Sequence, residues 1–270
     1  MGPGCMNQAQ VRRPAVPHLT IVKQTAPRRS KVWCGRRAMR SQDLEEMRRI
    51  PFFRSVEPGQ VEAMLRGAFL QRFPAHVELI HTGEPADFLH VVVEGTVEMF
   101  SVHRDRETTL GVSGPGDSFI LAAVLFDRPY LQSARALLAS RILMVPADAV
   151  RQAFAADAGF ARAIAENLAL AYRGVIKELK NQKLRSGLER LANWLLTHDA
   201  ENGSTGHFDF PFDKKVLAAR LGMAPEVLSR SFAALGAYHV VVHGPSVVIQ
   251  DVAALRKLAH PCSTIDGTSL

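Results

Sequence analysis

The stretch from Pro225 to Leu235 carries three polar side chains whose types and spacing suit contact with another molecule. Glu226, Ser229 and Arg230 stand three and four positions apart, so a helix places them on one side. The apolar side chains then fall roughly opposite: Leu228, Phe232 and Leu235. Arginine can donate two hydrogen bonds to guanine, glutamate can accept one from cytosine, and serine can reach a base or a phosphate. One face is therefore predicted to be buried and the other to read base edges.

Two short helices and a hairpin are predicted around these side chains. The pattern indicates a helix from Asp213 to Arg220, a turn at Gly222 and a second helix that begins at Pro225. Proline is favoured at the first helical position because its missing N–H would be unpaired there. The run "VVVHGPSVVI" follows and predicts a hairpin that turns at Gly244 and Pro245. This order matches a winged helix-turn-helix, whose second helix enters the major groove of DNA.

The polar face of the second helix permits two interpretations. Glu226 and Arg230 are four residues apart, and such a pair commonly forms a surface ion pair. Their place in a helix-turn-helix favours DNA contact, and the two interpretations are compatible because an ion pair can hold Arg230 ready for its base. The predicted DNA-binding residues are Pro225, Glu226, Ser229, Arg230, Lys214 and Lys215.

A long apolar stripe precedes the winged domain. It follows helical spacing on a predicted helix of more than about 20 residues and comprises Phe160, Ile164, Leu168, Ala171, Val175 and Leu179. We interpret the stripe as the seam of a homodimer, with packing on the chain's own sheets as the alternative. Ser186 and Glu189 then form an S-x-x-E capping box, which predicts that a new helix and a second domain begin there.

Short β-rich runs lie upstream of the stripe and are separated by glycines. They predict a small antiparallel roll, so we expect an α+β fold. The predicted domains are a disordered basic tail (1–40), a β-roll that binds an effector (41–155), a dimerisation helix (156–184), the winged helix-turn-helix (185–260) and a second disordered tail (261–270).

Three segments carry a family resemblance: "HTGEPADFLHVVVEGTVEMF", "GDSFILAAVLFDRPYLQSARAL" and "LAARLGMAPEVLSRSFAAL". In this order, with the long helix before the last, they resemble the cyclic AMP receptor protein and fumarate–nitrate reduction (CRP/FNR) regulators over about residues 44–258. The resemblance implies a homodimeric transcription regulator whose partners are double-stranded DNA and RNA polymerase, with a cyclic-nucleotide-binding-like roll. A cytoplasmic location is expected separately, because the sequence shows neither a secretory signal region nor a membrane span. Pro225-Glu226 and the ExxSR form look most like the dissimilatory nitrate respiration and nitrite reductase regulators, which respond to nitric oxide. That likeness implies TTGAT-like inverted repeats as targets.

The same resemblance argues against cyclic AMP as effector. The cyclic AMP branch has a glutamate for the ribose and an Arg-Ser pair for the phosphate, and these align with Ala122 and Gln132-Ser133. Glutamine lacks the charge and the planar fork of arginine. Arg135 stands close by, but its place on the strand does not suit it as a substitute. The iron–sulfur branch has clustered N-terminal cysteines, whereas only Cys5 and Cys34 occur there.

An apolar effector remains as the prediction for the roll. The predicted pocket consists of Phe119, Leu121, Ala122, Val124, Gln132 and Ser133. It suits haem, although the apolar segment "FILAAVLF" could equally be core with no ligand. Neutral imidazole can ligate haem iron. Four histidines in the roll are candidate ligands: His76, His81, His90 and His103.

Composition limits the remaining classes of function. The net charge is +7, but residues 1–40 hold nine Lys/Arg and no acid, so the rest of the chain is nearly neutral. This basic tail could add phosphate contacts, or it could have little consequence.

The 3 cysteines include no CxxC pair, so neither a disulfide framework nor a zinc site is indicated. No apolar run of about 18 residues occurs, and no membrane contact is expected. No P-loop, GxSxG, HExxH or Rossmann motif is present, so an enzyme is not expected; a constitutive architectural DNA-binding protein is the main alternative.

Overall fold

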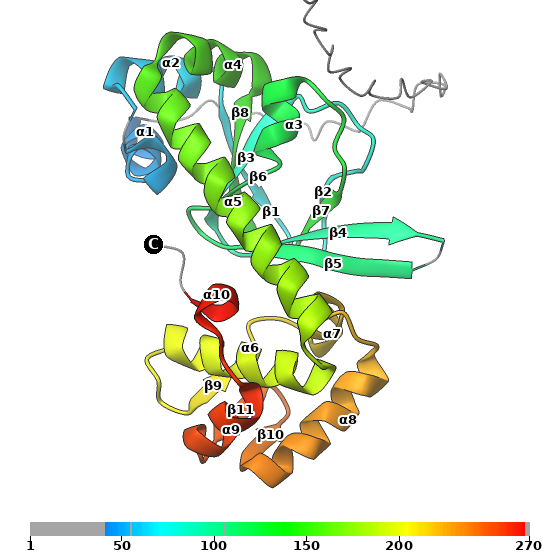
Figure 1. Cartoon of the computed structure of the whole chain (residues 1–270). Coiled ribbons are helices and arrows are strands. Elements are labelled where there is room, and N and C mark those ends of the chain that lie inside the picture. The colour runs from blue at the N-terminus through cyan, green and yellow to red at the C-terminus, as the bar shows by residue number, and fades with distance from the viewer. Residues whose placement is uncertain (1–40, 55, 105, 268–270) are drawn as a thin grey trace, which may run out of the picture. The chain divides into compact units, whose positions relative to one another are not determined.

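The structure is a computed structural model that describes residues 41–54, 56–104 and 106–267, all within one compact unit (Figure 1). The predicted basic tail, residues 1–40, lies outside these ranges. The α+β fold is confirmed, with antiparallel sheets in the first half of the chain and a winged helix-turn-helix in the second.

A β-roll follows two short helices, α1 (Ser41–Arg48) and α2 (Pro58–Arg66), which flank the 3-10 turn η1 (Pro51–Phe53). Its strands are β1 (Phe69–Phe73), β2 (Glu78–Ile80), β3 (Phe88–Glu94), β4 (Val97–His103), β5 (Arg106–Ser113), β6 (Ser118–Phe119), β7 (Ser133–Ala136) and β8 (Ser140–Pro146). Helix α3 (Leu121–Phe126) lies between β6 and β7. The strands form two 4-stranded antiparallel sheets, in the orders β1-β8-β3-β6 and β2-β7-β4-β5. The predicted roll is therefore confirmed.

One apolar core holds the roll and its flanking helices together. Leu89 and Val91 of the central strand β3 are fully buried. The Phe52 ring of η1 packs edge to face on Phe53 and Phe160, with centroids 5.2 and 5.6 Å away. Burial of each such side chain contributes about 1.5–3 kcal/mol. The N-terminal turn and the start of the long helix are thus part of the same core.

Gly95 shows why the turn between β3 and β4 requires glycine. Its φ is +88°, a conformation that is strained for other residues. A side chain there would also collide with the backbone of Ala139 and Ser140, which passes directly against it. The hairpin can therefore close only with glycine at this position.

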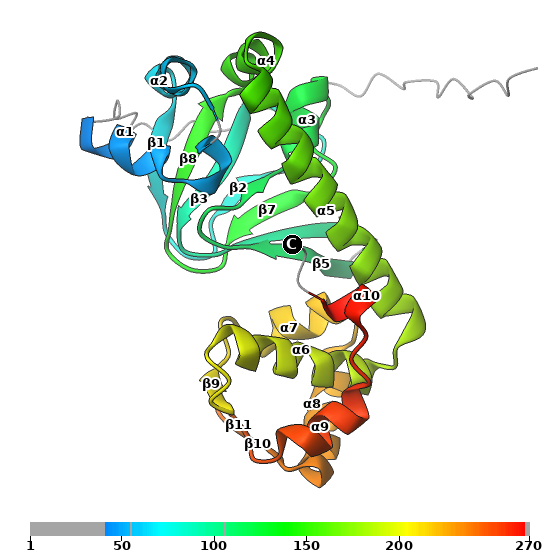
Figure 2. The same cartoon turned by 60° about the vertical axis from the view of Figure 1, so that its left-hand side comes forward.

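Two helices leave the roll: α4 (Ala147–Ala156) and α5 (Ala158–Leu184), which is 27 residues long. Asp157 caps α5, and its carboxylate accepts a hydrogen bond from the Phe160 N–H at 2.7 Å. Figures 1 and 2 both show α5 lying along the roll and continuing past its strands. In the described ranges neither α5 nor another helix is long and apolar enough to cross a membrane.

The apolar stripe of α5 divides into two parts. Phe160 and Ile164 are 0% and 1% exposed and belong to the core of the roll, with Leu168 packed beside them. Ala171, Val175 and Leu179 are exposed. The prediction of a dimer seam is therefore wrong for Phe160 and Ile164, because the chain's own roll already covers them.

The winged domain begins with α6 (Gly187–Glu201) and continues through β9 (His207–Asp209), α7 (Lys214–Arg220), α8 (Pro225–Leu235), the 3-10 turn η2 (Gly236–Tyr238), β10 (Val240–His243), β11 (Ser246–Ile249) and α9 (Val252–Ala259). The predicted capping box is present: the Glu189 N–H donates to the Ser186 hydroxyl, and the Ser186 N–H donates to the Glu189 carboxylate. The wing is a 3-stranded sheet in the order β10-β11-β9.

The C-terminal residues correct one prediction. Residues 261–270 are predicted as a disordered tail, but Ser263–Asp266 form a short helix, α10. The Asp266 carboxylate accepts a hydrogen bond from the Cys262 N–H at 2.7 Å and also pairs with Arg185. These polar contacts order a segment that has little apolar content, which is why its composition alone was misleading.

Candidate nucleic-acid interface and effector site

Helix α8 presents the predicted polar face to solvent. Pro225, Glu226, Ser229 and Arg230 are all exposed. The opposite side of the helix is anchored in the core of the winged domain by Leu228, Phe232 and Leu235. Among the residues that the structure describes, Glu226 and Arg230 form no ion pair with each other, so their side chains remain available to a partner. A rigid helix with an unoccupied polar face can be placed against base edges.

A groove of about 430 Å³ lies between the start of α8, helix α7 and the wing. Its lining is Lys214, Lys215, Pro225, Leu228, Ser229, Phe232 and Val242. Four of the six predicted DNA-binding residues thus meet at one place, whereas Glu226 and Arg230 lie outside the lining. Basic side chains beside a helix N-terminus form a suitable environment for phosphate.

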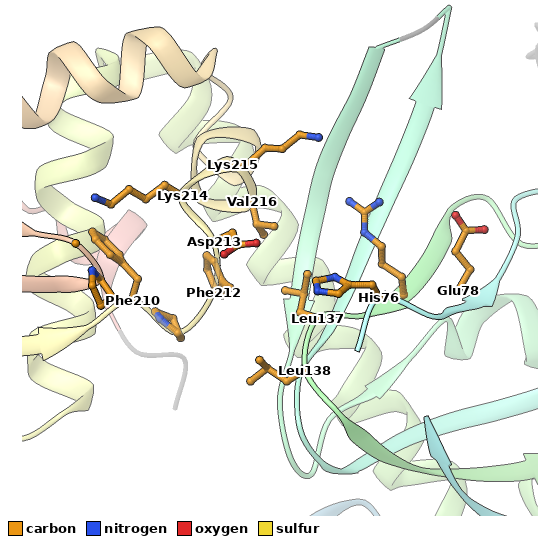
Figure 3. A pocket seen from close by; sticks show the side chains of 14 residues that line it. His76, Glu78, Leu137, Leu138, Phe210, Phe212, Asp213, Lys214, Lys215 and Val216 are labelled. Carbon is orange, nitrogen blue, oxygen red and sulfur yellow. The ribbon is translucent and has the colours of Figure 1, made fainter. Parts of the chain in front are cut away.

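Lys214 has a contact that the sequence did not indicate. Its ammonium lies 5.2 Å from the centroid of the Phe210 ring and 5.6 Å from that of Phe232. Figure 3 shows the Lys214 side chain beside Phe210 and the Lys215 side chain directed away from it. Cation–π attraction orients Lys214, so this residue also helps to fix α8 through Phe232.

The turn between α7 and α8 is held from two other helices. Gly222 has a φ of +63°, as the predicted tight turn requires. Arg190 of α6 donates from Nε to the Leu221 carbonyl at 2.8 Å, and Gln182 of α5 donates to the Arg220 carbonyl at 3.5 Å. Sequence reasoning missed both residues, because nothing local marks a side chain that reaches a distant carbonyl.

The apolar segment "FILAAVLF", which includes α3, packs mainly in the core of the roll. Phe119, Leu121 and Val124 are 4%, 4% and 0% exposed within the roll. Ala122 is exposed, because on this helix positions 121 and 124 face inward and 122 faces outward; its place in an effector pocket stays a prediction. Gln132 is half-buried.

Ser133 and Arg135 are already engaged inside the roll. The Ser133 hydroxyl accepts a hydrogen bond from the Thr82 N–H at 3.0 Å. Arg135 pairs with Glu98 and with Glu107, each at 2.7 Å. The hydrogen bond from Arg135 holds the pKa of Glu107 below its ordinary value, and the bond to Glu107 raises the pKa of Arg135. Two carboxylates thus engage the arginine that stands two residues after Ser133.

Among the four candidate haem ligands, His90 differs from the others. His76, His81 and His103 are exposed, whereas His90 is 3% exposed and stacks on Phe119 with centroids 5.3 Å apart. Its Nδ1 is buried without a hydrogen-bond partner. Desolvation lowers the pKa of His90 to about 4, although the Phe88 carbonyl opposes this shift. His90 is therefore neutral at pH 7.

A metal site of three or more His, Cys, Asp or Glu side chains does not occur within the described ranges.

Comparison with known families assigns both domains. Residues 70–157 match the cyclic nucleotide-binding domain, and residues 189–258 match the Crp-like helix-turn-helix domain. The chain is a CRP-like transcription regulator. A DNA-binding helix-turn-helix is therefore part of its function, and α8 occupies the place of the recognition helix within the matched domain.

Known CRP-like proteins are similar over most of this regulator. It is 24% identical over 221 residues to the "CRP-like cAMP-activated global transcriptional regulator" of Mycobacterium tuberculosis, covering 80% of this chain and 99% of the relative. A structure from Silicibacter pomeroyi DSS-3, a regulatory protein described as a candidate cAMP-binding protein, is 28% identical. It covers 81% of this chain and 100% of its own, with a TM-score of 0.54. FixK2 from Bradyrhizobium japonicum shares the fold at 22% identity and a TM-score of 0.62, over 71% of this chain and 96% of its own.

Proposed function

We propose that this regulator is a cytoplasmic homodimer that recognises TTGAT-like inverted repeats through α8. The proposal rests above all on the exposed face of Glu226, Ser229 and Arg230, on a helix whose other side is anchored in the domain core. Arg230 would bind guanine in the major groove, and Lys214 and Lys215 would contact phosphate. Contact with RNA polymerase follows from the family resemblance and belongs to the same proposal.

The second half of α5 supports self-association. Tyr172 is 67% exposed, Val175 is 64% exposed and Leu179 is 51% exposed. These residues recur at three- and four-residue spacing, as in a coiled-coil seam. Since an exposed apolar stripe on a helix is costly in water, we propose that the same stripe of a second copy covers it. Two α8 helices would then face DNA together, as an inverted repeat requires.

Arg230→Ala tests base recognition. It should weaken binding to a matched half-site by about 1–3 kcal/mol and relax the preference for the guanine. Fluorescence anisotropy with matched, singly changed and scrambled duplexes measures both effects. Arg256→Ala, which removes an exposed arginine from α9, is the control and should keep the sequence preference. Equal losses on matched and scrambled DNA would support an architectural protein that binds without sequence preference.

Val175→Glu tests the dimer. A charge in the middle of the seam should convert the dimer to a monomer and weaken binding to a two-half-site operator. Sedimentation velocity measures the first effect and anisotropy the second. Gln152→Glu adds the same charge at an exposed position on α4 and should change neither. A Val175→Glu protein that remains dimeric would exclude this seam.

We also propose that the roll responds to an effector other than cyclic AMP, with haem as the first candidate and nitric oxide as its signal. Support comes from Gln132 at the position of the phosphate-binding arginine, from the engagement of Arg135 by two carboxylates, and from the buried, unpartnered Nδ1 of His90. Cyclic AMP is the competing candidate, because the mycobacterial relative is described as cAMP-activated.

An anaerobic titration with haem distinguishes these effectors. A saturable Soret band that shifts with nitric oxide, is lost in His90→Leu and persists in His81→Leu would support haem. Calorimetry with cyclic AMP, together with operator binding in its presence, should show no effect. Saturable cyclic AMP binding that raises operator affinity would refute the proposed effector while leaving the DNA-binding proposal intact.

A further inference from the structure

The C-terminal segment Cys262–Gly267, called the C-terminal clamp below, lies against the junction between α5 and α6. Helix α10 within it contacts α5, and Figure 2 shows it beside the end of that helix. The matched helix-turn-helix domain ends at residue 258, so the clamp lies outside the region that the family comparison covers. Its contacts are polar and specific, which sets it apart from a fraying terminus.

The central contact of the clamp is an ion pair between Arg185 and Asp266. Two parallel hydrogen bonds of 2.6 and 2.5 Å join the guanidinium to the carboxylate. The Arg185 side chain is 7% exposed and that of Asp266 is 20% exposed. Burial opposes ionisation of Asp266, but the bonds from Arg185 and from the Cys262 N–H outweigh it and hold its pKa below the ordinary value. Such a shielded, bidentate pair has a defined geometry.

Arg185 occupies the junction itself. It is the C-cap of α5 in an extended conformation, and the next residue, Ser186, is the N-cap of α6. Its carbonyl accepts a hydrogen bond from Arg190 at 2.7 Å. Because Arg190 also donates to the Leu221 carbonyl, the junction is connected to the turn that precedes α8. The direction in which α6 leaves α5 thus affects where α8 lies.

Two lysines of α5 extend the clamp along the helix. Lys180 donates to the Thr264 hydroxyl at 2.6 Å, and Lys177 donates to the Gly267 carbonyl. At about 100° per residue, Lys177 lies on the side of α5 opposite to Val175 and Leu179. The clamp therefore supports each α5 from outside and leaves the proposed dimer seam free.

We propose that the C-terminal clamp fixes the angle between α5 and α6, with Arg185 and Asp266 as positioning residues for DNA binding. Neither residue lies on α8, and both act through the junction on the position of the recognition helix. In the proposed dimer, this angle sets the separation of the two α8 helices. The inference rests on the proposed function for its effect on DNA, but not for its effect on the junction.

Asp266→Asn tests the clamp in the full-length protein, because it removes the charge while it keeps the side-chain size. Amide hydrogen exchange over residues 181–190 should become several-fold faster without DNA present. Operator affinity should fall by about tenfold, which is within the usual range of coupling between sites. Asp266→Glu, which restores the charge, should recover most of the affinity. Asp127→Asn, which removes a carboxylate that is 81% exposed in the roll, should change neither measurement.

A second variant ends at Pro261 and removes the whole clamp; circular dichroism establishes that each variant is folded. The truncation should reproduce both effects of Asp266→Asn. Unchanged exchange at 181–190 in both variants would overturn the proposal, even if operator binding falls. Faster exchange with unchanged operator affinity would overturn the role in DNA binding. If the wild-type chain shows no operator preference, faster exchange in the variants would still support the clamp while the proposed DNA target fails.

Discussion

The two halves of α5 have the same apolar spacing and different surroundings. Phe160 and Ile164, in the first half, are 0% and 1% exposed, whereas Tyr172 and Val175, in the second, are 67% and 64% exposed. The first half lies on the roll, where Phe52 packs against Phe160. A helical period thus identifies the apolar side of a helix, but what covers that side depends on how far the neighbouring domain extends.

The largest expected effect on stability is that of a change in the covered first half of α5. Phe160→Ala should lower the free energy of unfolding by about 3–5 kcal/mol, because it leaves a cavity in the roll core. Urea denaturation followed by circular dichroism measures this. Tyr172→Ala, in the exposed half, should cost less than about 0.5 kcal/mol at a protein concentration where the chain is monomeric. Similar costs for the two variants would contradict the division of the helix.

The stability of the roll core, which covers the first half of α5, should also fall at acid pH because of His90. The unfolded chain protonates this histidine near its ordinary pKa of 6.5, and the folded chain does so only near 4. Stability due to His90 is therefore complete above pH 6.5 and is lost as the pH falls toward 4, by about 3 kcal/mol in total. Urea denaturation at pH 7 and pH 4 should show this loss in the wild type and a smaller one in His90→Phe. Identical pH dependence of stability in the two proteins would show that His90 does not cause the loss.

Helix α6, which follows the exposed half of α5, should depend on its capping box. Ser186→Ala removes the acceptor for the Glu189 N–H and should destabilise α6 by about 1 kcal/mol. Ser186→Asp, which keeps an N-cap acceptor, should retain most of the stability. Thermal unfolding of both variants provides the measurement, and an equal loss in both would argue against a capping role.

The smallest effect on a single chain is expected from Val175→Ser. Its cost in the monomer should be below about 0.5 kcal/mol, since the side chain is already in water. A partner that binds only the folded state makes the stability of the protein depend on the partner's concentration. In a homodimer the partner is a second copy of the same chain. The unfolding midpoint of the wild type should therefore rise with protein concentration, and that of Val175→Ser should rise less. A loss of about 2 kcal/mol in the monomer would show that this half of the helix is covered by the chain itself.

Local signals in the sequence accounted for most of the winged domain. Pro225 at the start of α8, Gly222 in the turn and the capping box at Ser186 each act within a few residues, and the structure has all three. The alternation of β-rich runs and glycines predicted the roll for the same reason. Such features can be deduced because the residues that determine them are neighbours in the chain.

What the sequence did not reveal depends on distant partners. Helix α10 is ordered because Asp266 meets Arg185, 81 positions earlier. Lys214 is oriented by Phe232, which comes from another helix. The inward burial of Phe160 depends on Phe52, which belongs to the N-terminal turn. No local pattern encodes these encounters. Composition therefore wrongly predicted a disordered end, and the helical spacing of the apolar residues wrongly predicted an uninterrupted seam.

The ion pairs of Arg135 have a consequence for aggregation. In its sheet β5 is an edge strand, and unpaired edges invite other chains to add strands. Arg135, on β7, binds Glu107 of β5 and Glu98 of β4, so it ties the edge to the sheet interior. The irregular register between β4 and β5 disturbs the edge further. Neutralising Glu107 would leave this edge less charged and no longer tied to Arg135, and the addition of strands from other chains at β5 would become easier.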